Sequence, residues 1–238
     1  MSTAAIIVIG DEILGGKVVD ANSPWLAVQL RGLGVDLMRI SVVPDLLDGI
    51  ADEVARCSQA FDHVFTSGGV GPTHDDRTMQ GVAQAFGVPL QRHPELVRVL
   101  KQKMAEPNES TLLMADVPAG AHLLWDGDLY FPVVVMRNVH IFPGVPSLLQ
   151  RKFSAIAPRF GGVVMHSLEF VTQERETDIA ERLSAAQERW PAVAIGSYPQ
   201  FDSRPWTVTI TMDSRDTEAL KACEAELRSL IQVEAQRR

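Results

Sequence analysis

Cysteine is nearly absent from this chain of 238 residues, which contains only Cys57 and Cys223. The two cysteines stand far apart, and neither belongs to a Cys-x-x-Cys pair or to a spacing typical of metal ligands. Their scarcity argues against a disulfide-stabilised secreted domain. We therefore expect two buried free thiols in a protein of a reducing compartment.

Positive charge is also scarce, because 22 lysines and arginines face 30 aspartates and glutamates, for a net charge of -8. Proteins bind nucleic acids and anionic membranes through cationic surfaces, so we expect neither partner. The first apolar run, residues 4–9, is too short for a signal peptide, and no later run approaches the length of a membrane span. The sequence therefore predicts a cytoplasmic protein.

What is present is an alternation of apolar runs and amphipathic segments over residues 1–160. Short runs that are apolar throughout are typical of parallel strands buried on both faces, and segments of helical periodicity separate many of them. This rhythm predicts an α/β domain of three layers, with helices on both faces of a mostly parallel sheet. The expected strands are 6–9, 37–43, 63–67, 122–125, 133–136 and 139–142, the expected helices are 25–33, 50–57, 77–86, 95–104 and 147–153, and 105–121 has loop character.

The pair Gly161-Gly162 marks the joint between this first domain, residues 1–160, and a smaller α+β domain, residues 161–238. The pattern of the smaller domain is strand, helix, two strands and helix, which can pack helices on one face of a three-stranded sheet. The expected strands are 164–171, 193–197 and 206–212, and the expected helices are 176–190 and 217–233.

The segment most informative about function is a glycine loop at residues 66–78, directly after an expected strand. Gly68, Gly69 and Gly71 allow the backbone to turn sharply and to approach a ligand closely, and the free amides of the following helix suit a phosphate. Asp75 and Asp76 come next. Because carboxylates repel phosphate unless a cation lies between them, the loop predicts a site for a metal-bridged phosphate or pyrophosphate.

Asp75 and Asp76 are the candidate catalytic residues, and together with Asp45 they are the candidate metal ligands. Carboxylates hold hard divalent cations, which clamp phosphate oxygens and activate water. An alternative is that Asp76 only caps the following helix. His74 offers a ligand for a softer metal such as cobalt or zinc, although adjacent side chains usually point apart.

Three further loops follow expected strands, namely 10–12, 44–45 and 143–146. Ligands of open α/β sheets bind at the carboxyl ends of the strands, so these loops form one acidic, glycine-lined pocket if the strand order brings them together. Asn22 or Ser23 is expected to cap the helix that follows, and Asn22 could instead contact the ligand. The hydroxyls of Thr73 and Thr78 could bind phosphate or the helix end. The expected ligand-binding residues are Gly10, Asp11, Glu12, Asn22, Gly68, Gly69, Gly71, Pro72, Thr73, Thr78, Pro143, Gly144 and Pro146.

These motifs occur in an order that resembles the molybdopterin-binding-like (MogA/MoaB) superfamily, the N-terminal region of CinA, and especially the N-terminal molybdopterin-binding-like domain of eukaryotic FAD synthases. The segments that carry the resemblance are 10–14, 20–22, 42–45, 68–78 and 142–146, and the segments 131–133, 135–139 and 195–199 are similar to the FAD-synthase branch. The smaller domain resembles the KH-like domain of CinA. The GxxG loop of RNA-binding KH domains is not evident in it, so RNA binding is not expected.

The resemblance implies a three-layer α/β domain and a nucleotide ligand that contains a pyrophosphate. CinA-type and FAD-synthase-type domains are associated with hydrolysis of ADP-ribose or FAD, which implies a divalent metal (cobalt or magnesium) together with potassium. Asp76 matches the acidic position that MogA-type enzymes use in catalysis. The resemblance also implies a homo-oligomer. We expect neither the CinA deamidase activity nor FAD synthesis from this chain.

The first hypothesis is therefore a metal-dependent pyrophosphatase acting on FAD, ADP-ribose or a related dinucleotide. A second hypothesis is a protein that binds or adenylylates molybdopterin in molybdenum-cofactor biosynthesis. A third is a nucleotide-binding module without catalysis.

Overall fold

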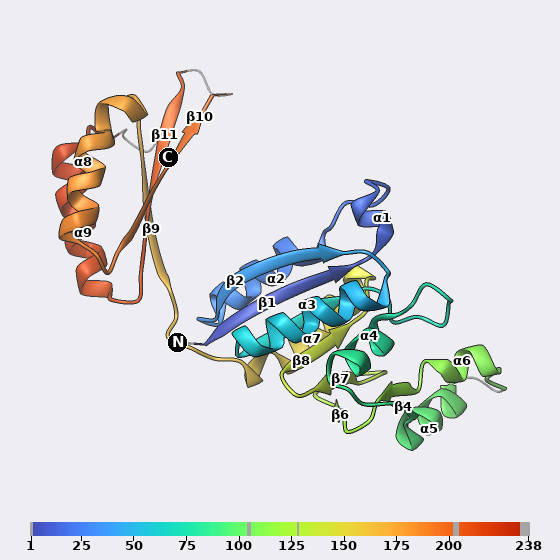
Figure 1. Ribbon diagram of the computed structural model, residues 1–238. Coiled ribbons are helices and arrows are strands. Elements are labelled where there is room, and N and C mark those ends of the chain that lie inside the picture. The colour runs from blue at the N-terminus through green and yellow to red at the C-terminus, as the bar shows by residue number, and fades with distance from the viewer. Residues whose placement is uncertain (1, 104–105, 128, 202–204, 234–238) are drawn as a thin grey trace. The chain divides into compact units, whose positions relative to one another are not determined.

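The computed structural model describes residues 2–103, 106–127, 129–201 and 205–233 (Figure 1). The chain divides into two compact units, Met1–Gly162 and Val163–Arg238, and each is described by itself. None of the helices in the described ranges combines the length and the apolar character needed to cross a bilayer.

The first unit is built on a six-stranded sheet with the strand order β2-β1-β3-β8-β7-β6. Strands β2, β1, β3 and β8 run parallel, and β7 is antiparallel to both of its neighbours. The predicted mostly parallel sheet is therefore confirmed. The elements of this unit are β1 (Thr3–Ile9), α1 (Asp11–Leu14), α2 (Asn22–Gly32), β2 (Asp36–Val43), α3 (Leu47–Ala60), β3 (His63–Ser67), α4 (Thr78–Ala85), β4 (Leu90–Arg92), α5 (Pro94–Lys103), α6 (Glu109–Leu113), β5 (Asp116–Pro118), β6 (His122–Leu124), β7 (Val133–Met136), β8 (Val139–Phe142), α7 (Pro146–Ile156) and a 3-10 turn, η1 (Ala157–Arg159).

The central strand β1 shows why three layers form. Its side chains point alternately to opposite faces of the sheet, and they are apolar and buried on both. Ala5, Ile7 and Ile9 pack in the cluster that contains residues of α3, α4 and α5, whereas Ile6 and Val8 pack with residues of α2 and α7. Helices therefore cover both faces of the sheet, as the sequence predicts.

The segment 106–121 differs from the prediction, which gave it only loop character. It contains the helix α6 and the strand β5, and β5 pairs antiparallel with β4 in a small separate sheet. The Arg92 guanidinium joins these elements, with Nε 2.8 Å from Asp116 Oδ1 and Nη1 2.6 Å from Glu109 Oε1. Met104 and Ala105, where the predicted helix ends and the predicted loop begins, lie outside the described residues.

The start of α2 also differs from the prediction. Neither Asn22 nor Ser23 is the cap, because both lie inside the helix and are buried. Their backbone amides instead donate to Asp20 Oδ1, at 2.9 and 3.2 Å. An aspartate that accepts from the first amides of a helix satisfies donors that have no partner within the helix. The side chain of Asn22 is thereby left for other contacts.

The second unit contains β9 (His166–Thr172), α8 (Glu176–Arg189), β10 (Ala194–Gln200), β11 (Thr207–Ser214) and α9 (Thr217–Leu230). Its three strands form an antiparallel sheet in the order β10-β11-β9, and residues of both helices pack in one cluster with residues of all three strands. Both helices lie on the same side of the sheet (Figure 1). The predicted order of strand, helix, two strands and helix is confirmed.

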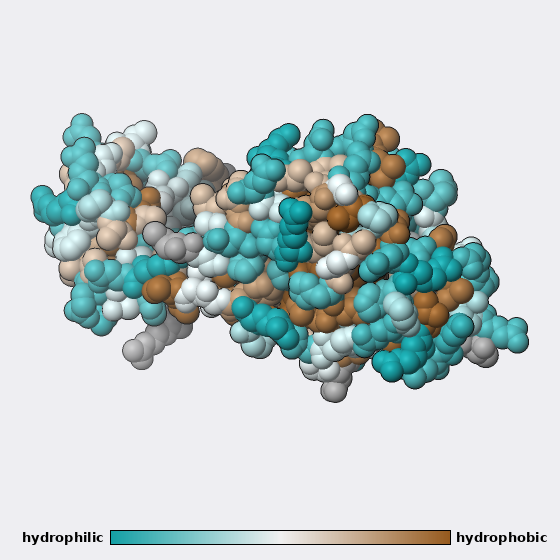
Figure 2. Space-filling view, turned by 60° about the horizontal axis from the view of Figure 1, so that its bottom comes forward, coloured by the Kyte–Doolittle hydropathy of each residue, from teal (hydrophilic) through white to brown (hydrophobic). Residues whose placement is uncertain are grey.

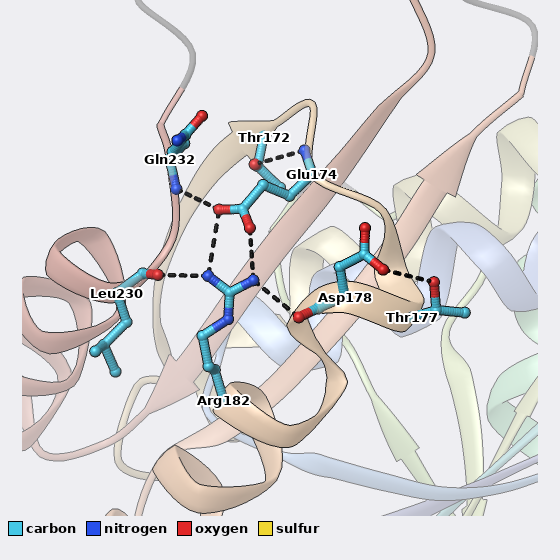
Figure 3. A network of polar contacts seen from close by, with 7 residues as sticks. All are labelled: Thr172, Glu174, Thr177, Asp178, Arg182, Leu230 and Gln232. Carbon is cyan, nitrogen blue, oxygen red and sulfur yellow. Dashed lines mark hydrogen bonds and ion pairs between the residues drawn. The ribbon is translucent and has the colours of Figure 1, made fainter.

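A polar network closes one end of the second unit (Figure 3). The Arg182 guanidinium donates to both carboxylate oxygens of Glu174, with Nη2 2.5 Å from Oε2, and also to the carbonyl oxygens of Asp178 and Leu230. The backbone amide of Gln232 donates to the same carboxylate. One arginine thus connects the loop before α8, the helix α8 and the end of α9.

Candidate functional site

Four loops of the first unit leave the sheet at one edge. The strands β2, β1, β3 and β8 are neighbours in this order and parallel, so their carboxyl ends lie side by side. The loops that follow them contain Asp45, then Gly10 to Glu12, then the glycine loop, then Pro143 to Pro146. The strand order therefore meets the condition on which the predicted pocket depends.

The glycine loop has the tight backbone that its sequence suggests. Gly68 has a φ of 103°, and a Cβ atom there would lie 2.1 Å from the carbonyl oxygen of Ile9. Only glycine can combine this conformation with such a close approach of β1 and β3. Thr78 fixes the conformation of the loop, because its hydroxyl donates to Gly68 O at 2.8 Å and its amide donates to Gly69 O at 2.9 Å.

This geometry corrects the expectation for Thr78. Its side chain is fully buried and its hydroxyl is hydrogen bonded to the loop. It therefore positions the glycine loop and presents no surface to a ligand. Pro72 and Thr73, in contrast, are exposed on the loop.

Asp76 closes the tip of the loop. Its Oδ2 accepts hydrogen bonds from the Thr73 amide at 2.8 Å and from the Thr73 hydroxyl at 2.5 Å. The alternative that Asp76 caps the following helix is wrong, because α4 begins at Thr78, its N-cap residue is Arg77, and no side chain caps it. The Asp76 carboxylate is held in the loop, close to the backbone of Gly71, where an added Cβ atom would lie 2.6 Å from Oδ2.

A group of carboxylates surrounds Asp45 at the same edge. Asp45 Oδ2 accepts a hydrogen bond from the backbone amide of Asp11 at 2.9 Å. Burial raises the pKa of Asp45, the Asp11 amide opposes this rise, and the negative charges of Asp11, Glu12 and Asp75 add to it. Within the described residues, no lysine or arginine forms an ion pair with Asp11, Glu12 or Asp45. Asp11, Glu12 and Asp45 therefore share one electrostatic environment in which no ion pair from the described residues offsets their charge, whereas Asp75 lies near the positive charge of Arg77.

The chemistry of this group suits a hard divalent cation, because its donors are carboxylate oxygens and a cation would offset their mutual repulsion. The three predicted ligands do not form a ready-made site, however. Across the described residues, no three side chains of histidine, cysteine, aspartate or glutamate are placed to hold a metal ion together. Asp76 is bonded to Thr73, and the Asp75 side chain is 64% exposed, with Oδ1 3.8 Å from Nδ1 of the exposed His74. The metal stays a prediction.

Asn22 lines a cavity of about 110 Å³ at this edge, together with Glu12, Ser67, Gly68 and residues of the 143–146 loop. Its Nδ2 donates to Ser67 Oγ and to the carbonyl oxygen of Gly144, both at 2.8 Å. Because a carbonyl oxygen only accepts, this contact fixes which way the amide points. Asn22 Oδ1 is buried and has no hydrogen-bond partner among the described residues.

A buried acceptor without a donor is unfavourable unless another molecule supplies the donor. Asn22 lines the cavity but its Oδ1 is itself buried, so a ligand hydroxyl or amino group could reach this oxygen only after the side chain moves. Sequence reasoning did not select two residues that build this cavity, Ser67 and Asp20. The position of Ser67, at the end of a strand and directly before the first loop glycine, could have indicated it.

The comparisons with known proteins agree with this architecture. Residues 5–161 match the family model described as "Probable molybdopterin binding domain", and residues 164–237 match the model "FAD synthase, middle domain". The chain is 35% identical over 258 residues to a protein of Caenorhabditis briggsae named "Probable FAD synthase", which covers 96% of this chain and 49% of that protein. A "CinA-like protein" of Myxococcus xanthus is 35% identical over 159 residues, or 63% of this chain and 37% of that protein.

Among solved structures, CinA from Thermoplasma acidophilum superimposes with a TM-score of 0.62 at 29% sequence identity, covering 68% of this chain and 100% of that chain. Glycine-rich and acidic loops at the carboxyl edge of a parallel sheet define an α/β protein of the class that binds small molecules at strand ends. More particularly, the chain belongs to the molybdopterin-binding domain family, which the match over residues 5–161 shows. It spans about half the length of the FAD synthases that it matches.

Proposed function

We propose that this chain is a metal-dependent pyrophosphatase that hydrolyses the diphosphate of FAD, ADP-ribose or a related dinucleotide. The observation that carries the proposal is the meeting of three features at one sheet edge. They are the glycine loop, the carboxylates around Asp45 with which no lysine or arginine of the described residues is ion-paired, and the cavity lined by Asn22, whose buried Oδ1 has no hydrogen-bond partner among the described residues.

In this proposal the loop amides and Asn22 bind the substrate, and Asp76 accepts a proton. Backbone amides of the loop from Gly69 to Gly71 approach the diphosphate, and Asn22 Oδ1, once its side chain moves, accepts from a ribose hydroxyl or an amino group. The oxygen of a water molecule forms a bond to one phosphorus, and the bond from that phosphorus to the bridging oxygen breaks. Asp76 accepts the proton of the water once its contacts with Thr73 are exchanged. FAD would give AMP and FMN, and ADP-ribose would give AMP and ribose 5-phosphate.

Asp45 and Asp75 would hold a divalent cation such as cobalt or magnesium, with potassium as a further ion. When bound, the cation supplies charge neutralisation at the phosphates and an activated water. Asp11 and Glu12 would complete the acidic rim. The raised pKa of Asp45 supports this assignment. Burial and the neighbouring negative charges disfavour the ionised form of Asp45, and a bound cation would stabilise that form.

The test is to incubate the purified chain with FAD or ADP-ribose, with cobalt, magnesium or manganese and potassium, and to quantify AMP by chromatography. We expect AMP with at least one metal and none after chelation. Asp76→Asn should lower the rate at least about hundredfold, whereas Asp52→Asn, at an exposed position of α3 away from this edge, should leave it unchanged. Absence of AMP from both substrates with every metal would overturn the proposal.

A second candidate is a role in molybdopterin binding or adenylylation, which the description of the family model for residues 5–161 favours. It predicts tight binding of a pterin and transfer of AMP from ATP. The non-catalytic alternative predicts nucleotide binding by calorimetry without turnover and no change on Asp76→Ala. The same set of assays therefore separates all three functions. The expected homo-oligomer can be measured alongside them by light scattering.

A further inference from the structure

A second, larger cavity lies in the first unit, with a volume of about 350 Å³. Its wall is almost entirely apolar and includes Met79, Met114, Phe131, Val134 and Leu148. Figure 2 shows hydrophobic residues reaching the surface of this unit among hydrophilic ones, and Leu148 is 50% exposed. The volume lies in the range of small-molecule sites, and thioether and aromatic side chains are good partners for a flat ring.

Both cavities are lined by residues of the glycine loop and of the 143–146 loop. Gly68 and Gly144 line the smaller cavity, whereas Val70 and Pro143, their near neighbours in sequence, line the larger one. A ligand whose diphosphate lies on the glycine loop could therefore place one end in each cavity.

Lys152, on α7, brings a cation into the apolar cavity. Its Nζ donates to the carbonyl oxygens of Phe131, at 2.8 Å, and of Pro132, and it lies 5.2 Å from the centre of the Phe131 ring. An ammonium group has three donors, so one remains beyond these two carbonyls. Burial lowers the pKa of Lys152 to about 8, and no carboxylate of the described residues forms an ion pair with it. A half-buried ammonium group in an apolar wall favours a ligand that brings an acceptor.

We infer that the larger cavity binds a flat heteroaromatic ring that carries carbonyl oxygens, as the isoalloxazine ring of a flavin does, and that Lys152 donates to one of these oxygens. This inference rests on the proposed function, because it places one end of the dinucleotide whose diphosphate lies on the glycine loop. Adenine could accept from the ammonium group only through ring nitrogens, so a comparison of FAD with ADP-ribose, which share adenine, isolates the contribution of the flavin ring. Of the two substrates considered above, FAD carries such a ring and ADP-ribose does not.

The experiment compares three ligands that share parts of one molecule. Dissociation constants of FAD, ADP-ribose and riboflavin are measured by calorimetry and, for the flavins, by fluorescence anisotropy. The variants are Lys152→Met, which keeps the length of the side chain, and Leu148→Trp, which fills the cavity from its exposed rim. Matched controls are Lys221→Met, at an exposed lysine of the second unit, and Val28→Trp, at an exposed position of α2.

We expect riboflavin to bind even without the adenylate half of FAD, and we expect FAD to bind more tightly than ADP-ribose. Lys152→Met and Leu148→Trp should each weaken FAD and riboflavin at least about tenfold and change ADP-ribose by less than about twofold, while the controls change nothing. If riboflavin does not bind, or if Lys152→Met weakens FAD and ADP-ribose equally, Lys152 only clamps the backbone at Phe131 and Pro132, and the inference is overturned.

The two proposals fail in different ways. Riboflavin binding that depends on Lys152, without AMP from FAD or ADP-ribose, would uphold the ring site and overturn the pyrophosphatase. AMP from both substrates at equal efficiency, without riboflavin binding, would uphold the pyrophosphatase and overturn the ring site.

Discussion

The carboxylates around Asp45 in the first unit and the arginine-paired carboxylates of the second unit stand in opposite electrostatic situations. In the second unit, Glu174 is paired with Arg182, Glu226 with Arg189, and Glu224 with Arg228. The hydrogen bond from Arg182 lowers the pKa of Glu174. These acidic groups are paired with arginines of the same unit; the first two pairs connect different elements, and Glu224–Arg228 lies within α9.

At the carboxyl edge of the sheet in the first unit, no arginine of the described residues forms an ion pair with Asp45, and the pKa of Asp45 is raised. A carboxylate that burial and its neighbours disfavour in the charged form reduces the stability of the fold. The same functional group is thus held by an arginine in the network of Arg182 and has no arginine or lysine paired with it at Asp45, among the described residues. Sites that retain such unfavourable charge are functional candidates.

The substitution Asp45→Asn tests whether this carboxylate serves the reaction rather than the stability of the fold. Removing one negative charge should leave the free energy of unfolding unchanged or raise it by up to about 1 kcal/mol, because the amide oxygen can still accept from Asp11. AMP release should fall at least about hundredfold, since a bound metal contributes several kcal/mol to catalysis. Urea titration and the chromatographic assay measure the two effects. A variant that loses stability and activity together would show that Asp45 is structural.

A second change tests the loop that supports this edge. Gly68→Ala should lower the free energy of unfolding by roughly 3–5 kcal/mol and abolish nucleotide binding, because the new Cβ meets the Ile9 carbonyl in addition to the strain of the positive φ. Gly87→Ala is the matched control. Gly87 has a φ of 64° with nothing within 4 Å of an added Cβ, so only the conformational cost of about 1 kcal/mol applies. Similar losses for the two variants would contradict the close approach of β1 and β3.

Lowering the pH should destabilise the first unit before the second. His140 is buried and its pKa is lowered to about 4, chiefly by burial. Between pH about 6.5 and about 4 the unfolded chain binds a proton at this position that the folded chain does not, so the first unit loses about 3 kcal/mol as the pH falls through this window. Glu174 contributes its stability above its ordinary pKa of 4.5 and loses it only below that value.

Hydrogen exchange monitored by mass spectrometry resolves the two units at each pH. His140→Gln should remove most of the loss in the first unit, with a smaller part left to His63, whose pKa burial also lowers. Earlier opening of the second unit on acidification would reverse the comparison.

The smallest expected effect concerns the paired carboxylates themselves. Arg182→Met keeps much of the side-chain volume and removes the hydrogen bonds to Glu174, Asp178 and Leu230. The free energy of unfolding of the second unit should fall by roughly 1.5–3 kcal/mol, which is the range for hydrogen bonds to charged groups, while AMP release stays unchanged. Denaturant titration followed by Trp190 fluorescence would report it, since the Trp190 indole donates to Glu226 in the same unit. A loss of activity would mean that the second unit contributes to the reaction.

Much of the fold could be predicted because its signals are local. The strand 63–67 and the two strands 133–136 and 139–142 have the expected bounds, since each is a short apolar run closed by polar or turn residues. Arg137 adopts a positive φ of 54° in the turn between the latter two, as a tight hairpin connection requires even without glycine. The convergence of the four loops was predicted only on the condition that the strands are neighbours, and the strand order of the structure supplies that condition.

What could not be predicted depends on contacts between distant segments. Strand β4 is only three residues long, and it forms because it pairs with β5 some 25 residues later in the chain, counted from Leu90–Arg92 to Asp116–Pro118. Asn22 is a cap by its sequence context, but Asp20 takes that role and Asn22 turns to Ser67 and Gly144. Lys152 has no motif around it, and only the fold shows that its helix brings a cation into an apolar cavity. Such positions are set by packing rather than by local preference.

The position of the glycine loop and the 143–146 loop, which line both cavities, has a kinetic consequence. Once the diphosphate is cut, each half of the dinucleotide would rest on its own side of the loop, and neither would block the way out of the other. The two products should then bind at the same time and inhibit turnover multiplicatively, and a double-inhibition plot of AMP against FMN should show lines that intersect rather than run parallel.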